Sequence, residues 1–317
     1  MSIFYLILGI VLLVVGGEYL VKASVALSLK FRLSRIAIGM TVVSFATSLP
    51  ELLVSINAAW DGHPDLALSN VVGSNIANIA LVLGVTAILT PIYIKRVSYK
   101  FNIPAMILMS LLVYWFLKND LVLSFAEGFV LFVLLILFVY ILLKNSSESG
   151  EIDLDELEEI DEDIEHSSLL RILIWLIIGG VALWGGAELL VKGAVELAKY
   201  LGVSERVIGV SIVAIGTSIP ELAASVISAL KKEKDLSLGN LIGSNIFNIG
   251  SVLGITAMIK PIHVQDMKLI NSDILWMLFI AIVLIPFALL PKRNKIGWWK
   301  GTVYVLIYLA YMYFVVS

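Results

Sequence analysis

The sequence predicts an all-α polytopic membrane protein, with ten transmembrane helices arranged as two five-helix repeats of inverted topology. The first observation behind this prediction is composition: the 317 residues are 60% hydrophobic and 15% charged, whereas about a quarter of the residues in an ordinary soluble domain are charged. The second is that apolar windows recur along the whole chain. The third is that the two halves repeat one another in sequence.

The composition excludes several classes of protein. A soluble enzyme of this length would need more polar surface to cover its core, and a single-span receptor would hold its apolar residues in one stretch. The chain contains no cysteine, which excludes a disulfide framework, a thiolate metal site and a cysteine nucleophile. It also lacks a basic patch large enough to bind nucleic acid.

The apolar windows predict ten spans, because a helix needs about 20 residues to cross the hydrocarbon core. We interpret the N-terminal apolar stretch as part of the first span, since no basic segment precedes it and no small-residue cleavage site follows. The predicted spans are 3–27, 36–60, 66–90, 101–117, 123–144, 169–196, 206–230, 236–259, 273–291 and 299–316.

One long polar segment separates the two halves. Residues 148–165 hold 11 of the 25 acidic side chains, and a block of like charges repels itself and stays solvated. We therefore predict three parts: a first five-helix repeat at 1–144, an acidic linker at 145–168, and a second five-helix repeat at 169–317. The linker is interpreted as a solvated connector, and the sequence gives no further support for a regulatory role.

The two halves derive from one duplicated unit. Residues 16–92 align with 186–262 at a constant offset of 170, and 35 of these 77 positions are identical. Each unit has five spans, an odd number, so the second begins on the opposite side of the membrane from the first. Such inverted repeats are common in alternating-access transporters. The most similar blocks are Thr47–Leu52 against Thr217–Leu222, and Gly73–Ile79 against Gly243–Ile249.

Lys and Arg residues predict the orientation. With Lys22 and Lys192 set aside as lying in apolar context, the loops after odd-numbered spans carry 15 basic residues and the opposite side carries 5. Cytoplasmic loops are enriched in Lys and Arg. We therefore expect a multi-pass protein of the cell membrane, with both termini outside and the acidic linker in the cytoplasm.

Glu51 and Glu221 are the strongest candidates for functional residues. An ionisable side chain within a span is costly and indicates function. Each glutamate follows a proline, Pro50 or Pro220, and proline in a helix leaves the carbonyl four residues earlier without its usual partner. Irregular backbone at membrane depth is tolerated where it lines a cavity or is buried in protein. Both motifs therefore combine a carboxylate with exposed backbone oxygens.

Helical spacing extends this predicted site along two helices in each half. Every side chain on these stripes presents oxygen, which suits Ca²⁺ and Na⁺, whereas a transition metal would recruit imidazole or thiolate. Two carboxylates close together cannot both stay ionised while empty, so they must take up cations or protons in exchange. The stripes are Ser44, Ser48, Glu51 and Ser55; Asn70, Ser74 and Asn78; Thr217, Ser218, Glu221 and Ser225; and Asn240, Ser244 and Asn248.

Some polar residues have a structural interpretation. Asn75 and Asn245 could join helices by hydrogen bonds. Glu18 lies four residues before Lys22, and the same pair recurs in the second half, a spacing that allows ion pairs along a helix.

The two duplicated blocks resemble the cation/calcium exchanger superfamily, and most closely its prokaryotic sodium/calcium exchangers. The superfamily motifs G-T-S-x-P-E and G-S-N-x-x-[ND]-I are matched by Gly216–Glu221 and Gly243–Ile249. The resemblance covers the ten-span plan and is most specific in residues 39–84 and 209–254. It implies an antiporter, without cofactor or enzymatic activity, that carries Ca²⁺ and Na⁺ and needs no obligate protein partner.

Carried over by position, the resemblance also implies roles for individual residues. Glu51 and Glu221 would be the central Ca²⁺ ligands, together with the carbonyls of Thr47 and Thr217. The first spans of the two halves would move against the remaining helices. Flanking Na⁺ sites would use both glutamates with Ser48, Ser74, Ser218, Ser244 and the carbonyls of Ser44 and Ala214, while Asn78 and Asn248 would line the centre beside Pro50 and Pro220.

Two departures from the family pattern matter. The first half has Ala46 where the motif has glycine, which adds bulk where the helix would unwind. Asn248 occupies a position where potassium-dependent members have Asp, which weighs against potassium co-transport. A proton/calcium exchanger of the same fold is the alternative, although such proteins usually have G-N-x-x-E in place of T-S-x-P-E. A cation channel is a more distant alternative.

Overall fold

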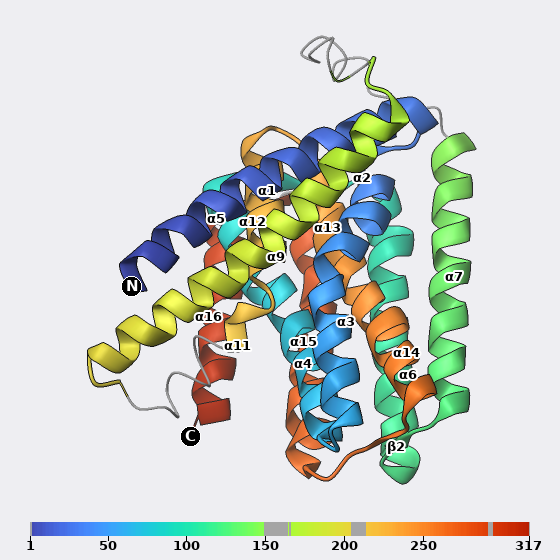
Figure 1. Ribbon diagram of the computed structural model, residues 1–317. Helices are drawn as coiled ribbons and strands as arrows, with labels where there is room; N and C mark the ends of the chain where they lie inside the picture. The colour runs from blue at the N-terminus through green and yellow to red at the C-terminus, as the bar shows by residue number, and fades with distance from the viewer. Residues whose placement is uncertain (1, 149–163, 165, 204–213, 291–293, 317) are drawn as a thin grey trace. The chain divides into compact units, whose positions relative to one another are not determined.

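The computed structural model describes residues 2–148, 164, 166–203, 214–290 and 294–316, and the chain is helical over nearly all of them (Figure 1). Short π-helical segments, labelled η, interrupt several helices. The elements are α1 (Ser2–Phe31), α2 (Arg35–Ile38), η1 (Gly39–Val43), α3 (Ser44–Trp60), α4 (Pro64–Ile76), η2 (Ala77–Leu83), α5 (Gly84–Leu89), β1 (Ile92–Tyr93), η3 (Ser98–Asn102), α6 (Ile103–Asp120), β2 (Val122–Leu123), α7 (Phe125–Glu148), α9 (Leu169–Tyr200), α11 (Ala214–Gly216), α12 (Ile219–Leu230), α13 (Lys234–Phe247), η6 (Asn248–Leu253), α14 (Gly254–Ile259), β3 (Ile262–His263), η7 (Leu269–Asp273), α15 (Ile274–Leu289), β4 (Lys295–Ile296) and α16 (Trp298–Val316).

Eight helical stretches in the described part of the chain are long and apolar enough to cross a bilayer. Each coincides with a predicted span, and the ends differ by a few residues. The predicted span 206–230 lies partly outside the described residues, and its described part is α11 and the 12-residue α12. The last predicted span is α16, which is not one of the eight.

Large apolar side chains cover the outer faces of the long helices. On α1, Ile3 and Ile7 are 64% and 59% exposed, and on α9 Leu170 and Ile177 are 69% and 65% exposed. Exposure of such an extensive apolar surface to water would be unfavourable. These faces fit the hydrocarbon core of a bilayer.

The described chain divides into two compact units. The first comprises Met1–Thr47 and Val139–Asn240, and the second comprises Ser48–Phe138 and Leu241–Ser317. The boundary falls within α3, α7 and α13, so these helices contribute residues to both units.

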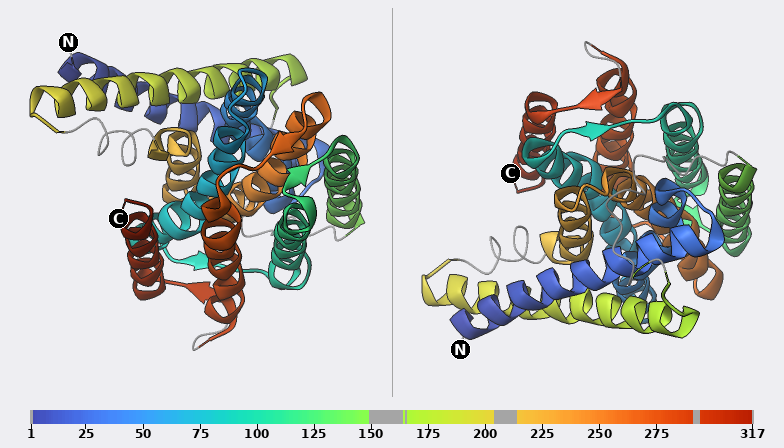
Figure 2. Two further views of the ribbon diagram at one scale, coloured as in Figure 1. Left: turned by 90° about the horizontal axis from the view of Figure 1, so that it is seen from below. Right: turned by 90° about the horizontal axis from the view of Figure 1, so that it is seen from above.

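A glycine seam joins the two longest helices, α1 and α9, in the first unit. The helices lie side by side and run antiparallel in all three views (Figures 1 and 2). A Cβ added at Gly16 would lie 2.9 Å from the Gly179 carbonyl oxygen, and one added at Gly186 would lie 3.0 Å from the Gly9 carbonyl oxygen. The backbones therefore touch where glycine recurs every seven residues, the repeat of a left-handed helix pair.

Other contacts of the first unit surround this pair. Helix α12 packs on both α1 and α9, with Ile227 against Gly17. The guanidinium of Arg35 is buried, and it forms an ion pair with Glu233 (Nε–Oε2 3.2 Å) while Nη1 donates to the Val25 carbonyl at 2.8 Å. A buried charge of this kind needs both a counter-charge and hydrogen bonds.

In the second unit, corresponding parts of the two halves make matching contacts. Gly84 of α5 meets Gly301 of α16, and Gly128 of α7 meets Gly254 of α14, with backbone atoms in contact in both cases. Strand β1 pairs antiparallel with β4, and β2 pairs antiparallel with β3. Each short strand pair therefore joins one segment from each half of the sequence.

The seam between α1 and α9 generates a stability prediction. A leucine at position 179 would clash with the α1 backbone, because a Cβ there lies 2.8 Å from the Leu20 nitrogen. Overpacking of this kind costs about 1–3 kcal/mol. Gly179→Leu should therefore lower the thermal stability of the purified protein in detergent.

The adjacent Gly180→Leu is the matched control, since nothing lies within 4 Å of a Cβ at that position. It carries the same change in volume, hydrophobicity and helix propensity. Equal melting temperatures for the two variants would contradict the seam.

Candidate cation site

Glu51 lies on α3 within the second unit, with a side chain that is completely buried. The neighbouring helix α4 is tied to it by Asn70, whose Nδ2 donates to Ser55 Oγ at 3.0 Å and to the backbone oxygen of Glu51 at 3.3 Å. Ser48, one turn before Glu51, is also buried, and its Oγ has no hydrogen-bond partner. This hairpin therefore holds a carboxylate and a hydroxyl oxygen away from water.

The two duplicated motifs differ in backbone conformation. Helix α3 continues through Pro50 without a break. In the second half α11 ends at Gly216, and α12 begins at Ile219 with Pro220 in its first turn, where the missing N–H of proline costs little. Glycine disfavours a helix by about 1 kcal/mol relative to alanine, and Ala46 takes that place in the first half.

Four asparagines form a reciprocal network in the second unit. Asn75 Nδ2 donates to the backbone oxygen of Asn245 at 3.3 Å, and Asn245 Nδ2 donates to the backbone oxygen of Asn75 at 3.1 Å. The Oδ1 atoms of these two residues accept hydrogen bonds from Asn248 and Asn78 respectively, each at 3.1 Å. The interpretation of Asn75 and Asn245 as residues that join two helices is confirmed.

This network leaves two amide oxygens without a partner. Asn78 and Asn248 are fully buried, and the Oδ1 of each has no hydrogen-bond partner. Both residues also stand at the start of π-helical segments, Asn78 in η2 and Asn248 in η6, and such segments are frequent at functional sites. Ser74 and Ser244, one turn earlier on α4 and α13, are buried as well.

In the first unit, Asn240 joins the beginning of α3 to α12. Its Oδ1 accepts a hydrogen bond from Thr47 Oγ1 at 3.2 Å, and its Nδ2 donates to Ser225 Oγ at 2.9 Å. Ser44 Oγ donates to the Asn240 backbone oxygen at 3.0 Å and to the Gly39 backbone oxygen at 2.8 Å. The side chains of Ser44 and Thr47 are therefore used within the protein, and the Ser44 backbone oxygen also accepts a hydrogen bond from Thr47 Oγ1 at 3.4 Å.

Glu221 is the buried carboxylate of the first unit. It lies in the first turn of α12 and is completely buried. Ser218 precedes this helix and is buried, with no hydrogen-bond partner for its Oγ. Thr217 is half-buried in the turn between α11 and α12, and Ala214 begins α11.

The chemistry of these groups suits a hard cation. No group of three or more His, Cys, Asp or Glu side chains gathers in the described ranges. A cation held by the predicted residues would therefore be bound by one or two carboxylates together with hydroxyl, amide and carbonyl oxygens. Alkali and alkaline-earth cations accept such a mixed set of oxygens.

Two features differ from what the sequence suggests. Glu18 pairs with Lys231 (Oε1–Nζ 3.1 Å) rather than with Lys22 on its own helix. Lys300, which the distribution of Lys and Arg counts among the loop residues although the predicted span 299–316 includes it, lies in α16 and is 1% exposed. Its Nζ donates to the backbone oxygens of Phe287 at 2.5 Å and Lys295 at 2.6 Å. The sequence signal for this burial is the position of Lys300 at the start of the apolar stretch 299–316.

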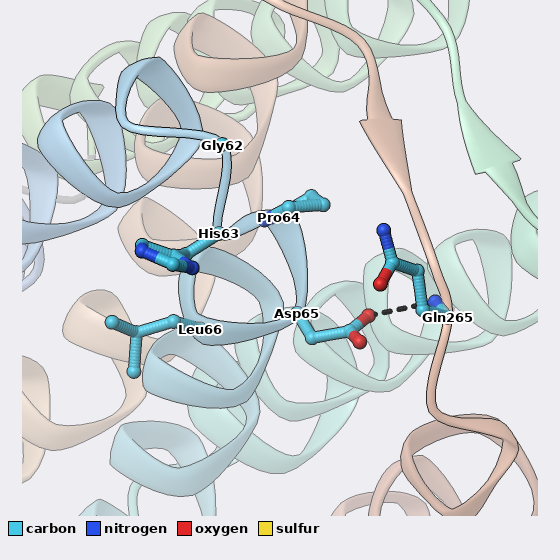
Figure 3. A pocket seen from close by; sticks show the side chains of 6 residues that line it. All are labelled: Gly62, His63, Pro64, Asp65, Leu66 and Gln265. Carbon is cyan, nitrogen blue, oxygen red and sulfur yellow. Dashed lines mark hydrogen bonds between the residues drawn. The ribbon is translucent and has the colours of Figure 1, made fainter.

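A surface pocket lies elsewhere in the second unit. It is lined by Gly62–Leu66 and Gln265, and it contains none of the predicted site residues (Figure 3). The carboxylate of Asp65 accepts hydrogen bonds from the backbone nitrogens of Gln265 and Asp266 at 2.9 and 3.0 Å, so it joins the first turn of α4 to the loop after β3.

Comparison with known proteins gives consistent results. The family model described as sodium/calcium exchanger protein matches residues 1–144 and 171–317. The chain is 37% identical over 314 residues to the putative antiporter CaxA of Alkalimonas amylolytica, covering 99% of this chain and 98% of CaxA. It is 29% identical over 342 residues to the sodium/calcium exchanger MaX1 of Methanosarcina acetivorans, covering 97% and 96% of the two chains.

The solved structures agree with the sequence comparison. A structure of the sodium-calcium exchanger NCX_Mj, soaked with zero Na⁺ and Ca²⁺, matches with a TM-score of 0.82 and 32% sequence identity, covering 98% of this chain and 97% of NCX_Mj. The expected resemblance to the prokaryotic members of the cation/calcium exchanger superfamily is thereby confirmed. This chain is a multi-pass membrane protein that belongs to the sodium/calcium exchanger family.

Proposed function

We propose that this protein is a secondary active antiporter that exchanges Na⁺ for Ca²⁺ across the cell membrane by alternating access. Family membership supports cation/Ca²⁺ antiport, and the relatives CaxA and MaX1 are named as an antiporter and a sodium/calcium exchanger. The T-S-x-P-E pattern of both halves favours Na⁺ over H⁺ as the counter-ion.

The observation that carries the proposal is the burial of a duplicated carboxylate. Glu51 and Glu221 occupy equivalent places in the two halves, and both are 0% exposed. An ionised carboxylate sequestered in an apolar protein is unfavourable unless a cation or a proton neutralises it. Cation binding to these two residues explains why the chain keeps them there.

We assign the ligands as follows. Ca²⁺ is bound by the carboxylates of Glu51 and Glu221 with the backbone carbonyls of Thr47 and Thr217. Asn78 and Asn248 line the centre, beside Pro50 and Pro220. Na⁺ is bound by the same glutamates with Ser48, Ser74, Ser218, Ser244 and the carbonyls of Ser44 and Ala214. The unpartnered Oγ atoms of Ser48 and Ser218 support this assignment.

The membrane topology belongs to the same proposal. Ten spans form two five-helix repeats of inverted topology, with 206–230 and α16 as the seventh and tenth. Both termini lie outside and the acidic linker 145–168 lies in the cytoplasm, as the distribution of Lys and Arg favours. The first span of each repeat, α1 or α9, moves to open the site to alternate sides of the membrane.

The first prediction concerns the two glutamates. Glu51→Gln and Glu221→Gln replace a carboxylate with a neutral amide of the same size, so the protein should fold but lose the charge that Ca²⁺ requires. We expect Na⁺-driven Ca²⁺ uptake into proteoliposomes to fall to the level of protein-free vesicles for each variant.

Glu188→Gln is the control for this experiment. Glu188 also lies within a predicted span, but it is an exposed residue of α9. Its substitution should leave uptake at the wild-type level. Near-normal Ca²⁺ uptake by either Glu51→Gln or Glu221→Gln would exclude that residue from the site.

A second prediction separates Na⁺ from H⁺ coupling. Ca²⁺ uptake by the wild-type protein should be driven by an outward Na⁺ gradient at equal pH, and it should not be driven by an outward H⁺ gradient without Na⁺. The reverse result would identify a proton/calcium exchanger. Flux that does not depend on a counter-ion on the far side would instead indicate a channel.

A further inference from the structure

The four-asparagine network of the second unit determines which atom of each amide is available to an ion. A side-chain amide has an oxygen that accepts and an NH₂ that donates, so exchanging the two ends changes a cation ligand into a group that repels cations. Orientation is therefore decisive for any amide that lines a cation site, and the surrounding hydrogen bonds set the orientations of Asn78 and Asn248.

The orientation of Asn75 follows from the backbone. The carbonyl oxygen of Asn245 can only accept a hydrogen bond, so the end of the Asn75 amide that lies 3.3 Å from it must be the NH₂. The sulfur of Met277, 3.6 Å from the same nitrogen, is a second acceptor. The Oδ1 atom of Asn75 therefore points away from the Asn245 carbonyl.

The oxygen of Asn75 then sets the orientation of Asn248. It lies 3.1 Å from the Asn248 amide, which must present its NH₂ to that oxygen. A flipped Asn248 would bring two amide oxygens into contact and leave its donors unsatisfied in a buried place, which is unfavourable. The Oδ1 of Asn248 is consequently the atom left without a partner.

The same sequence of contacts holds for the other pair. The backbone oxygen of Asn75 accepts from Asn245 at 3.1 Å, and the oxygen of Asn245 accepts from Asn78 at 3.1 Å. Asn78 Oδ1 is again left without a partner. Each half of the sequence therefore orients the ligand amide of the other half.

We infer that Asn75 and Asn245 are positioning residues, which fix the amides of Asn248 and Asn78 so that their oxygens, and not their NH₂ groups, are offered to the transported cation. This inference rests on the proposed function, since it assumes that Asn78 and Asn248 line the cation site. Ligands that are fixed before binding spare the cation the cost of reorganising them. Neither positioning residue touches the cation itself.

A double-mutant cycle tests this inference in proteoliposomes that contain the full chain. Asn75→Leu removes the acceptor that holds Asn248, and loss of a residue that orients a metal ligand typically weakens metal binding roughly 10- to 100-fold. We expect the KM for Ca²⁺ to rise by about that factor. In an Asn248→Ala background, Asn75→Leu should raise the KM by less than about twofold further, because the ligand that it positions is gone.

The crossed pair is the matched control. Asn75 does not hydrogen-bond to the Asn78 side chain in the network. In an Asn78→Ala background, Asn75→Leu should therefore raise the KM for Ca²⁺ by the same factor as it does in the wild-type background. A mirror cycle tests the other pair. The effects of Asn245→Leu and Asn78→Ala on the KM should be coupled, whereas the effects of Asn245→Leu and Asn248→Ala should be independent. If Asn75→Leu does not yield folded protein, the mirror cycle and the smaller Asn75→Ser substitution carry the same test.

Several outcomes would overturn the inference. Asn75→Leu and Asn248→Ala could raise the KM independently, or Asn75→Leu could lower the melting temperature and leave the KM for Ca²⁺ unchanged. The latter result would assign Asn75 a purely structural role. Unchanged KM values for both Asn78→Ala and Asn248→Ala would also refute it, because there would be no ligand to position.

Equilibrium Ca²⁺ binding to the purified protein distinguishes these failures from failure of the proposed function. Binding that follows the crossed pattern, without Ca²⁺ flux under either gradient, would support the inference and refute antiport. Binding and exchange without the crossed pattern would refute the inference alone. A wild-type protein that binds no Ca²⁺ would refute both.

Discussion

Polar groups inside an apolar protein must find their partners within the chain, and this constraint governs the arrangement around Glu51 and Glu221. Both carboxylates are completely buried, and burial disfavours an ionised carboxylate that lacks a counter-charge. The asparagines and serines nearby are largely engaged with one another or with backbone oxygens. Oxygen atoms without a hydrogen-bond partner remain at Ser218 in the first unit and at Ser48, Asn78 and Asn248 in the second, and each can act as an acceptor toward a cation.

Much of this arrangement could be predicted from the sequence, because the duplication supplies two copies of each signal. Apolar length located the helices, and the offset of 170 residues paired Glu51 with Glu221. Asn75 and Asn245 were recognisable as residues that join helices. Which atoms they would use was not predictable, since donor and acceptor roles depend on the register between two helices distant in sequence. The π-helical segments that include Asn78 and Asn248 have no local sequence signal either.

The places where the halves diverge were harder to predict. Both halves contain the motif T-S-x-P-E, but its proline occupies different places in the two helices. Pro220 lies in the first turn of α12, whereas Pro50 lies in the interior of α3. The difference correlates with glycine or alanine four residues earlier. The burial of Lys300 could not be predicted, because it depends on two carbonyls, those of Phe287 and Lys295, that tertiary packing brings to it.

The glycine seam between α1 and α9 has a mechanical consequence. Because backbone contacts backbone at these glycines, with leucine side chains such as Leu13 and Leu183 packed beside them, the two helices leave little room for displacement relative to one another. If α1 and α9 control access to the site from the two sides of the membrane, they move together along a single reaction coordinate. Closing one entrance and opening the other are then the same event, and a leak through two open gates is prevented by rigidity rather than by timing.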